Sequence, residues 1–258
     1  MVVLVTNDDG YKAAGLRELY RAARLVFGKN VVAVVPDTPQ SSSGMSFTFH
    51  KPLRVVKTSY EGMQCFTVSG TPADCVFIAN YHMFKGGVDL VLSGINEGMN
   101  AGLETMYSSG TISAAMFAAI SEIPSVALSK NIPKNAKGEY IKKSMKASFN
   151  RLVFILNRIK KFGLPEGSDI LNINFPIYMR RNTPIKIVKT DSMVFEDKVI
   201  KKMDPLGRHY YWLYGTLKKN LDKEADLYSL FRGNITITPI RLSESEYTAL
   251  EKARKVFS

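Results

Sequence analysis

The hydrophobic pattern of the chain opens with a short apolar run, residues 2–5, which a polar turn, residues 7–10, follows at once. The run is too short for a helix, and its β-branched composition is typical of a buried strand. Residues 15–27 then carry apolar side chains at helical spacing, and residues 31–35 form a second apolar run. Strand, helix and strand at this spacing predict a β-α-β unit with two parallel strands.

The same alternation continues along the chain. Apolar runs that end in polar residues predict further strands at residues 65–68, 88–92, 126–129 and 170–175. Helical spacing and helix-start signals predict helices at residues 71–84, 112–120 and 142–159. Residues 47–56 alternate in the manner of a hairpin. The whole pattern indicates an α/β fold with a Rossmann-like, doubly wound and mostly parallel sheet.

Beyond about residue 182 the pattern changes. Three short stretches indicate extended or antiparallel pieces, residues 185–188, 210–214 and 235–238, and residues 243–257 predict a charged terminal helix. We therefore divide the chain into an α/β core, residues 1–180, and a β-rich C-terminal extension, residues 181–258. The extension carries an aromatic load that one subunit has difficulty burying, which predicts a homo-oligomeric interface.

Composition adds a cellular setting. With 258 residues, 45% of them hydrophobic, the chain can bury a sizeable core without disulfide support. Its two cysteines, Cys65 and Cys75, lack metal-ligand spacing and are too few for a disulfide framework, which suggests a reducing compartment. The sequence shows neither a long apolar span nor a signal-peptide pattern. We therefore expect a cytoplasmic protein without a membrane partner.

The net charge of +12 admits two interpretations. It can serve recognition of a polyanion, or it can simply solvate the surface. The lysines and arginines concentrate after Lys130, mostly in dispersed pairs, and no nucleic-acid-binding motif accompanies them. We interpret the charge mainly as a solubilising surface and expect no stable complex with nucleic acid.

Candidate chemistry lies where the predicted strands end. Residues 7–10 contribute two adjacent carboxylates, residues 38–46 form a serine loop after the second strand, and residues 93–100 bring two asparagines after a later strand. The carboxyl ends of parallel strands share one edge of a sheet, where ligands bind. Taken singly, these loops are also ordinary turns or linkers. Together they form an all-oxygen set of the kind that Mg²⁺ or Mn²⁺ prefers.

A candidate anion site lies further along. Tyr107-Ser108-Ser109-Gly110-Thr111 precedes a predicted helix, and a helix N-terminus attracts anions through its unpaired N–H groups and dipole. An ordinary capped helix is the alternative. Thr71-Pro72-Ala73-Asp74 shows all the signals of a helix start and is interpreted as structural. An anion site beside a divalent cation points to phosphate chemistry.

These motifs resemble the survival protein SurE family of metal-dependent nucleoside monophosphate phosphatases. The resemblance spans nearly the whole chain, and the matching motifs are residues 3–10, 40–41, 46–48, 70–76, 93–96, Gly98, Asn100, 107–108, 110–111, 204–208, 210–212 and 235–239. It implies a cytoplasmic homodimer or homotetramer whose subunits exchange C-terminal segments.

Carried over residue by residue, the resemblance implies that four residues ligate the metal, Asp8, Asp9, Ser41 and Asn96. It also implies catalytic roles for Asp8, Asn100 and Ser108, with phosphate bound at Ser108, Ser109, Gly110 and Thr111. The family pattern is Tyr-Ser-Gly-Thr, and this chain has one extra serine. Spacing from Asn96 selects Ser108 and spacing from Gly110 selects Ser109. We favour Ser108, with the extra residue absorbed as a bulge before the helix.

The implied activity is that of a SurE-type acid phosphatase, a divalent-metal-dependent phosphomonoesterase that hydrolyses nucleoside 5'-monophosphates, with 3'-monophosphates as a further class. Adjacent aspartates on an extended backbone would point apart. A phosphatase that forms an aspartyl-phosphate instead needs two aspartates separated by one residue, so that both side chains point the same way. We therefore expect attack by a metal-bound water, with Asp8 as base or orienting group. The alternative is a non-catalytic nucleotide- or RNA-binding protein, for which no stacking or base-reading motif is visible.

Overall fold

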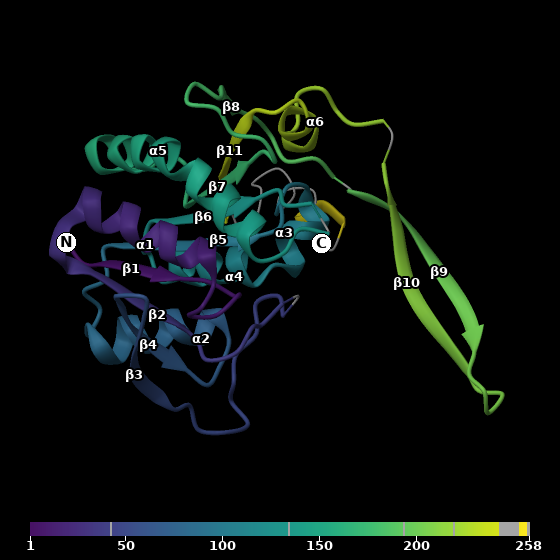
Figure 1. Cartoon of the computed structure of the whole chain (residues 1–258), viewed down its shortest axis with the longest axis horizontal. Coiled ribbons are helices and arrows are strands. Elements are labelled where there is room, and N and C mark those ends of the chain that lie inside the picture. The colour runs from purple at the N-terminus through teal and green to yellow at the C-terminus, as the bar shows by residue number, and fades with distance from the viewer. Residues whose placement is uncertain (42, 134, 193, 219, 243–252, 257–258) are drawn as a thin grey trace.

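A nine-stranded sheet forms the centre of the molecule in the computed structural model (Figure 1), which describes residues 1–41, 43–133, 135–192, 194–218, 220–242 and 253–256. Its strands are β1 (Val3–Thr6), β2 (Val31–Pro36), β3 (Val55–Tyr60), β4 (Met63–Val68), β5 (Leu90–Glu97), β6 (Ser125–Lys130), β7 (Ile170–Phe175), β8 (Ile185–Ile187) and β11 (Ile235–Ile240). A separate antiparallel hairpin consists of β9 (Phe195–Met203) and β10 (His209–Leu217).

The helices cover both faces of the sheet. They are α1 (Ala14–Phe27), α2 (Pro72–Phe77), α3 (Leu103–Ser108), α4 (Gly110–Ile120), α5 (Glu139–Phe162) and α6 (Asp226–Phe231), with a 3-10 turn η1 (Gly28–Asn30) and a π-helical turn η2 (Ile78–Met83). Helices α1 and α5 pack on one face, where Val3 and Val5 point. Helices α2 and α4 pack on the other face, around Leu4. This alternation follows from the two-residue period of a strand.

The sheet order is β3-β4-β2-β1-β5-β6-β7-β11-β8. Strands β4, β2, β1, β5, β6 and β7 are parallel, and β3 and β11 pair antiparallel with β4 and β7. The chain builds outward from β1 through β2 and then returns to β5 on the other side of β1. The predicted α/β, doubly wound and mostly parallel sheet is therefore confirmed, and its topological switch point lies between β1 and β5.

Several predicted boundaries were wrong. The hairpin expected at residues 47–56 is instead formed by β3 and β4, because Thr48 bonds to Asp74 and the ring of Phe47 packs edge-on against Phe117. Strand β5 continues through the expected loop at residues 93–97, because Asn96 pairs with Ser129 of β6. Helices α3 and α6 and strand β9 were not predicted. The predicted terminal helix lies outside the described residues apart from residues 253–256, which are helical.

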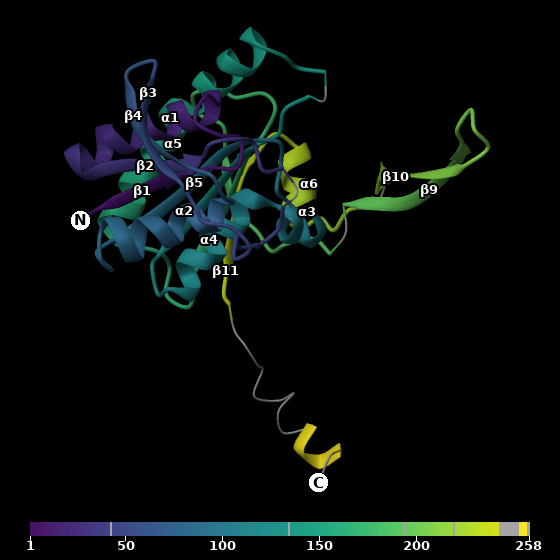
Figure 2. The same cartoon turned by 90° about the horizontal axis from the view of Figure 1, so that it is seen from below.

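The C-terminal segment contributes to the molecule in two ways. Strands β8 and β11 extend the central sheet, with β11 paired to β7. The β9–β10 hairpin instead projects from the body, which both views show (Figures 1 and 2). Among the described residues, no helix has both the length and the apolar character needed to cross a membrane. The division at residue 180 remains a prediction, since the central sheet runs across it.

Candidate active site

The turn after β1 places the two adjacent aspartates. Strand β1 is fully buried, and the chain bends directly after it, where the Asn7 side-chain amide donates to the Gly10 carbonyl oxygen at 3.0 Å. Asp8 and Asp9 both line one cavity. The expectation of divergent side chains assumed an extended backbone, and that assumption does not hold because the strand has already ended at Thr6.

The cavity lies at the carboxyl ends of β1 and β5, the switch point of the sheet. It has a volume of about 230 Å³ and is lined by Asp8, Asp9, Ser41, Asn96, Glu97, Met99, Asn100, Thr105, Ser108 and Ser109. The structure thus brings together the residues predicted as metal ligands and those predicted as catalytic. Gly110 and Thr111 do not line it but lie directly behind Asp8.

Asp8 is held by the first turn of α4. Its Oδ1 accepts a hydrogen bond from the Thr111 hydroxyl at 2.5 Å. A Cβ atom on Gly110 would lie 2.8 Å from the Asp8 Cβ, so only glycine allows the helix to approach this closely. Burial raises the pKa of Asp8, and the hydrogen bond from Thr111 opposes that rise. The backbone N–H groups of Asp8 and Thr111 oppose the rise as well.

Asp9 lies in a more negative environment. Its Oδ2 accepts from the Glu97 backbone N–H at 3.2 Å. Burial, followed by the charges of Asp8 and Glu97, raises the pKa of Asp9 to about 7. Burial also raises the pKa of Glu97. Three carboxyl groups therefore share a poorly solvated site, which favours a cation or a proton among them.

Three anchors hold the serine loop that brings Ser41 to the cavity. The Gln40 N–H donates to the Asp8 carbonyl oxygen at 2.8 Å, and the Gly44 N–H donates to the Ser108 carbonyl oxygen at 3.2 Å. At its far end, the Thr71 hydroxyl donates to the Ser46 carbonyl oxygen at 2.7 Å. The loop is thus fixed to the first strand, to α3 and to the start of α2.

The helix start at Thr71 has a role that the sequence did not reveal. The predicted capping box is present, with Thr71 and Asp74 each bonded to the other's backbone N–H. Asp74 Oδ2 also accepts from the Thr48 hydroxyl at 2.7 Å. The motif therefore both caps α2 and secures the loop that carries Ser41.

The two asparagines of the third loop are constrained to different degrees. The side-chain amide nitrogen of Asn96 donates to the Gly98 carbonyl oxygen at 3.0 Å, which leaves its amide oxygen for a ligand. Asn100 is held by a buried polar network: its side-chain amide donates to the Ser129 hydroxyl at 2.8 Å, and its carbonyl oxygen accepts from Asn172 at 2.7 Å. Asn174 accepts from its backbone N–H at 2.8 Å.

The sequence held a signal for this network. Residues 170–175 alternate isoleucine and leucine with asparagine in a fully buried strand, where unpaired amides would be costly. Such amides in a core strand predict a hydrogen-bond partner nearby, and that partner is the active-site loop.

The extra serine lies at a junction between two helices. Ser108 ends α3 and its hydroxyl donates to the Glu104 carbonyl oxygen at 3.0 Å. Ser109 has an extended backbone and caps α4, since its hydroxyl accepts from the Ile112 N–H at 3.2 Å. The additional residue is thus accommodated as this extended cap. Both side chains line the cavity.

The donor set suits a hard divalent cation. Asp8 and Asp9 provide anionic oxygens, and Ser41 and Asn96 provide neutral ones around the same cavity. Within the described residues, no group of three or more His, Cys, Asp and Glu side chains is arranged to hold a metal ion. A cation here would therefore depend on the hydroxyl and amide oxygens as well as the two aspartates.

Comparisons with known proteins point to one family. The family model of survival protein SurE matches residues 3–197. Among curated relatives, a protein of Pyrobaculum arsenaticum named 5'-nucleotidase SurE is 39% identical over 99% of this chain and 94% of its own length. One of the same name from Picrophilus torridus is 40% identical over 93% and 90%. The crystal structure of the SurE protein from Aquifex aeolicus superposes with a TM-score of 0.83 at 30% identity, covering both chains completely. The chain belongs to the SurE survival-protein family.

Proposed function

We propose that this chain is a divalent-metal-dependent phosphomonoesterase that hydrolyses nucleoside 5'-monophosphates, with 3'-monophosphates as a further substrate class. The observation that carries the proposal is the convergence of Asp8 and Asp9 in one cavity beside the N-terminus of α4. Carboxylates that bind a cation and a helix end that attracts an anion are complementary to a metal-bound phosphate. The name that the relatives share, 5'-nucleotidase SurE, supports a nucleotide as the substrate.

Asp8, Asp9, Ser41 and Asn96 would hold the cation, for which Mg²⁺ and Mn²⁺ are the best candidates given the all-oxygen donors. When bound, the cation would neutralise phosphate charge and lower the pKa of water. Asp8, which Thr111 orients through one carboxylate oxygen, would act as the base or as the group that orients the attacking water. Asn100 and Ser108 line the same cavity. The second amide N–H of Asn100 can donate to a phosphate oxygen, and the Ser108 hydroxyl would do so by turning away from the Glu104 carbonyl oxygen.

Removal of the cation tests the proposal. Hydrolysis of a nucleoside monophosphate panel and of a chromogenic phosphate ester should stop in excess EDTA and return on addition of Mg²⁺ or Mn²⁺. Full activity in excess chelator would contradict metal dependence. Absence of turnover with every metal and ester, combined with tight nucleotide binding, would instead favour the alternative of a non-catalytic nucleotide- or RNA-binding protein.

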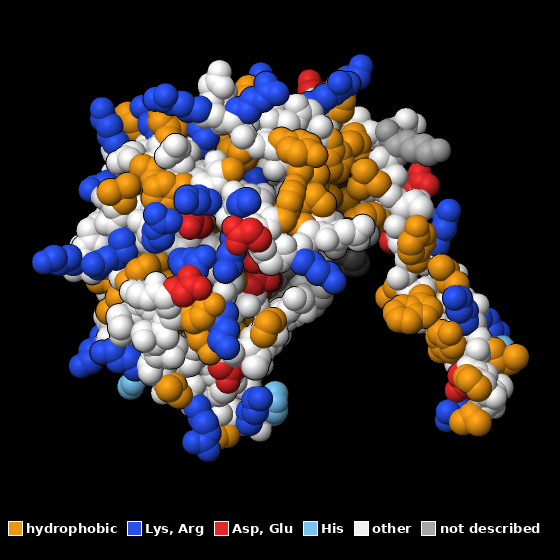
Figure 3. Space-filling model, in the orientation of Figure 1, with side chains coloured by type: hydrophobic (Ala, Val, Ile, Leu, Met, Phe, Trp, Pro, Cys, Tyr) orange, Lys and Arg blue, Asp and Glu red, His pale blue; other side chains and the backbone are white. Residues whose placement is uncertain are grey.

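We also propose a homodimer or homotetramer in the cytoplasm. The β9–β10 hairpin exposes apolar side chains along its length (Figure 3), including Trp212 at 61% and Leu213 at 87% exposure. A two-stranded hairpin is marginally stable at best when isolated in water. A second subunit that covers Trp212 and Leu213 would remove this apolar surface from water. The two free cysteines, both buried, are consistent with a reducing compartment.

Sedimentation at micromolar concentration tests the assembly. The wild-type chain should sediment as a dimer or tetramer, and Leu213→Lys should shift it toward smaller species because it places a charge in the covered surface. A wild-type monomer would overturn the proposed assembly without affecting the proposed reaction.

A further inference from the structure

Helix α3 is a short element that carries much of the cavity wall. It spans only Leu103–Ser108, yet Thr105 and Ser108 line the cavity and Asn100 lies just before its start. A helix of this length is not stable on its own. Its N-cap residue, Gly102, has a φ of 81° and no side-chain cap of its own. Whatever holds the start of α3 therefore also determines where these cavity residues lie.

A carboxylate 124 residues away supplies the missing cap. Asp226 Oδ2 accepts a hydrogen bond from the Gly102 N–H at 2.9 Å. Its Oδ1 accepts from the backbone N–H groups of Asp191 at 3.0 Å and Leu227 at 2.8 Å. The side chain is completely buried. A buried carboxylate at a helix N-terminus satisfies otherwise unpaired N–H groups and opposes the helix dipole.

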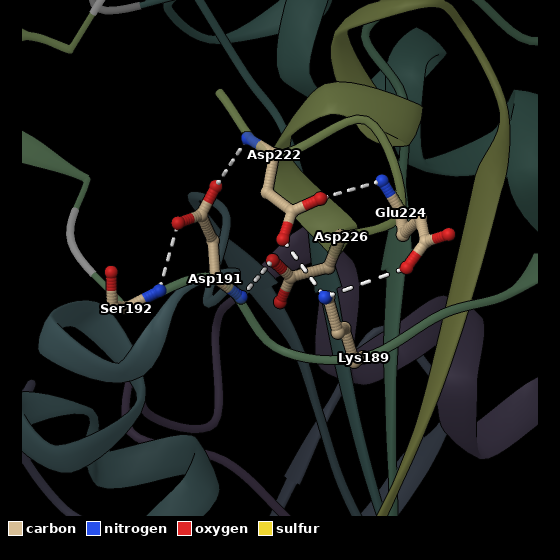
Figure 4. Close-up of polar contacts among 6 residues, drawn as sticks. All are labelled: Lys189, Asp191, Ser192, Asp222, Glu224 and Asp226. Atoms are coloured by element: carbon tan, nitrogen blue, oxygen red, sulfur yellow. Dashed lines mark hydrogen bonds and ion pairs between the residues drawn. The ribbon is translucent and has the colours of Figure 1, made fainter. Parts of the chain in front are cut away.

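The backbone around Asp226 completes the clamp. The Leu103 N–H, next in the first turn of α3, donates to the Asp191 carbonyl oxygen at 2.9 Å. Figure 4 shows Asp191 and Asp226 side by side, with the Asp191 N–H directed at the Asp226 carboxylate. The two residues together therefore bind the first two N–H groups of the α3 segment.

Apolar packing holds the same junction. Ala101, Val194, Leu227 and Leu230 form a small buried cluster between α6 and the start of α3. A Cβ atom on Gly102 would lie 2.6 Å from the Val194 Cγ2, so Val194 packs against this glycine too closely for any side chain there. The family match ends at residue 197, before Asp226 and α6.

The neighbouring charged residues form a natural control. Asp222 and Glu224 pair with the ammonium group of Lys189 at 2.9 and 3.6 Å, as Figure 4 shows. These side chains are 45%, 84% and 57% exposed, respectively. Exposed ion pairs contribute little to stability. Asp222 is four residues from Asp226 and makes no side-chain contact with Gly102 in the described structure.

We propose that Asp226 is a positioning residue of the active site, which fixes the N-terminus of α3 through Gly102 and thereby sets Asn100 and Ser108 against the phosphate. The proposal rests on the phosphomonoesterase function proposed above. Of the residues that would hold the cation, the two aspartates follow β1 and Asn96 belongs to β5, while the loop that carries Ser41 has only one of its three anchors on α3. Asp226 should therefore affect turnover far more than metal affinity.

The test compares Asp226→Asn with the control Asp222→Asn in the full chain. Asp226→Asn should lower kcat for a nucleoside monophosphate about tenfold or more, because a misplaced donor removes transition-state stabilisation. Its Kd for Mn²⁺, measured by calorimetric titration, should stay within about threefold of wild type. Asp222→Asn should leave both quantities unchanged. An unchanged kcat in Asp226→Asn, or a joint loss of kcat and Mn²⁺ affinity, would overturn the positioning role.

Hydrogen exchange of residues 99–110 provides a readout that does not depend on activity. These amides should exchange faster in Asp226→Asn than in wild type or Asp222→Asn, and equal exchange would refute the cap. If Asp226→Asn does not fold, Asp226→Glu keeps the charge and should show the same pattern more weakly. A wild-type chain that hydrolyses no phosphate ester would refute the proposed function, while the exchange comparison would still decide the cap.

Discussion

Two buried acidic clusters in this molecule have different hydrogen-bonding environments. In the cavity, Asp8 accepts a side-chain hydrogen bond from Thr111, and the backbone N–H groups of Asp8 and Thr111 also lower its pKa. Asp9 accepts one backbone N–H, from Glu97. Below α3, Asp226 receives three backbone N–H groups. Asp191 receives two, from Ser192 at 2.8 Å and Asp222 at 3.4 Å.

This difference suits the cavity aspartates to ligand binding and suits Asp226 and Asp191 to holding the start of α3. A buried carboxylate with several N–H donors is stabilised without a cation. In the cavity, burial and then the charges of Asp8 and Glu97 raise the pKa of Asp9 to about 7, so a proton or a metal is favoured there. Burial also raises the pKa of Asp226, but its three N–H donors work against that rise.

The largest expected effect is at the aspartates of the cavity. Asp8→Asn should lower kcat by about a hundredfold or more, because it removes an anionic oxygen from the site while keeping the side chain's shape. The fold should be retained, since the Thr111 hydroxyl can still donate to the amide oxygen. Asp89→Asn is the matched control, as Asp89 precedes β5 at the opposite edge of the sheet. Steady-state kinetics that show equal rates for both variants would refute the role of Asp8.

The serine pair Ser108 and Ser109 should give the next largest effect. A hydrogen bond to a charged phosphate contributes about 1.5–3 kcal/mol, so loss of the functional hydroxyl should slow turnover roughly ten- to a hundredfold. We expect this fall for Ser108→Ala. Ser109→Ala should instead lower stability by about 1 kcal/mol, because Ser109 caps α4.

Kinetics and thermal unfolding of the two serine variants separate these outcomes. A large fall in kcat for Ser109→Ala, with Ser108→Ala near wild type, would reverse the assignment. Near-wild-type kcat in both variants would exclude a hydroxyl role.

The affinity of the cavity for Mn²⁺ should depend on pH, because Asp9 titrates there. The pKa of Asp9, about 7, lies above its ordinary value of 3.8, so the folded protein without metal binds more protons than the unfolded chain between these limits. The contribution of Asp9 to the free energy of unfolding is therefore fully present below about pH 3.8 and is lost as the pH rises through about 7. A cation competes with the same proton, so Mn²⁺ affinity should rise by up to about tenfold per pH unit and level off above 7.

Calorimetric titration of Mn²⁺ from pH 5.5 to 8.5 measures this dependence. Asp9→Asn should bind Mn²⁺ more weakly, with a flatter pH profile. An affinity that does not change with pH in the wild type would contradict the competition between proton and metal.

Asp191, the partner of Asp226 in the second cluster, should affect stability rather than metal binding. Asp191→Ala leaves buried N–H groups without an acceptor, which costs about 1–3 kcal/mol and lowers Tm by several degrees. Mn²⁺ affinity should not change, because Asp191 lies outside the cavity. Glu224→Ala, at a side chain that is 84% exposed, should stay within about 0.5 kcal/mol of wild type. A weaker Mn²⁺ affinity in Asp191→Ala would show that the two clusters are coupled.

The sequence by itself determined the central sheet and the place of the cavity. Unbroken apolar runs specify the buried parallel strands, and the polar residues that follow β1 and β2 lie at one edge for that reason. The capping box at Thr71 was also readable, because its residues are three positions apart. In each case the deciding interaction is local or periodic.

Only the tertiary structure decided how the cavity is supported. Helix α3 is too short to show a period, and β9 carries charged residues at positions that a solvated loop would also allow. The bonds from Thr48 to Asp74 and from Gly102 to Asp226 join positions 26 and 124 residues apart. Such pairings leave no pattern in a single sequence, since they depend on where packing of the sheet and helices brings the chain.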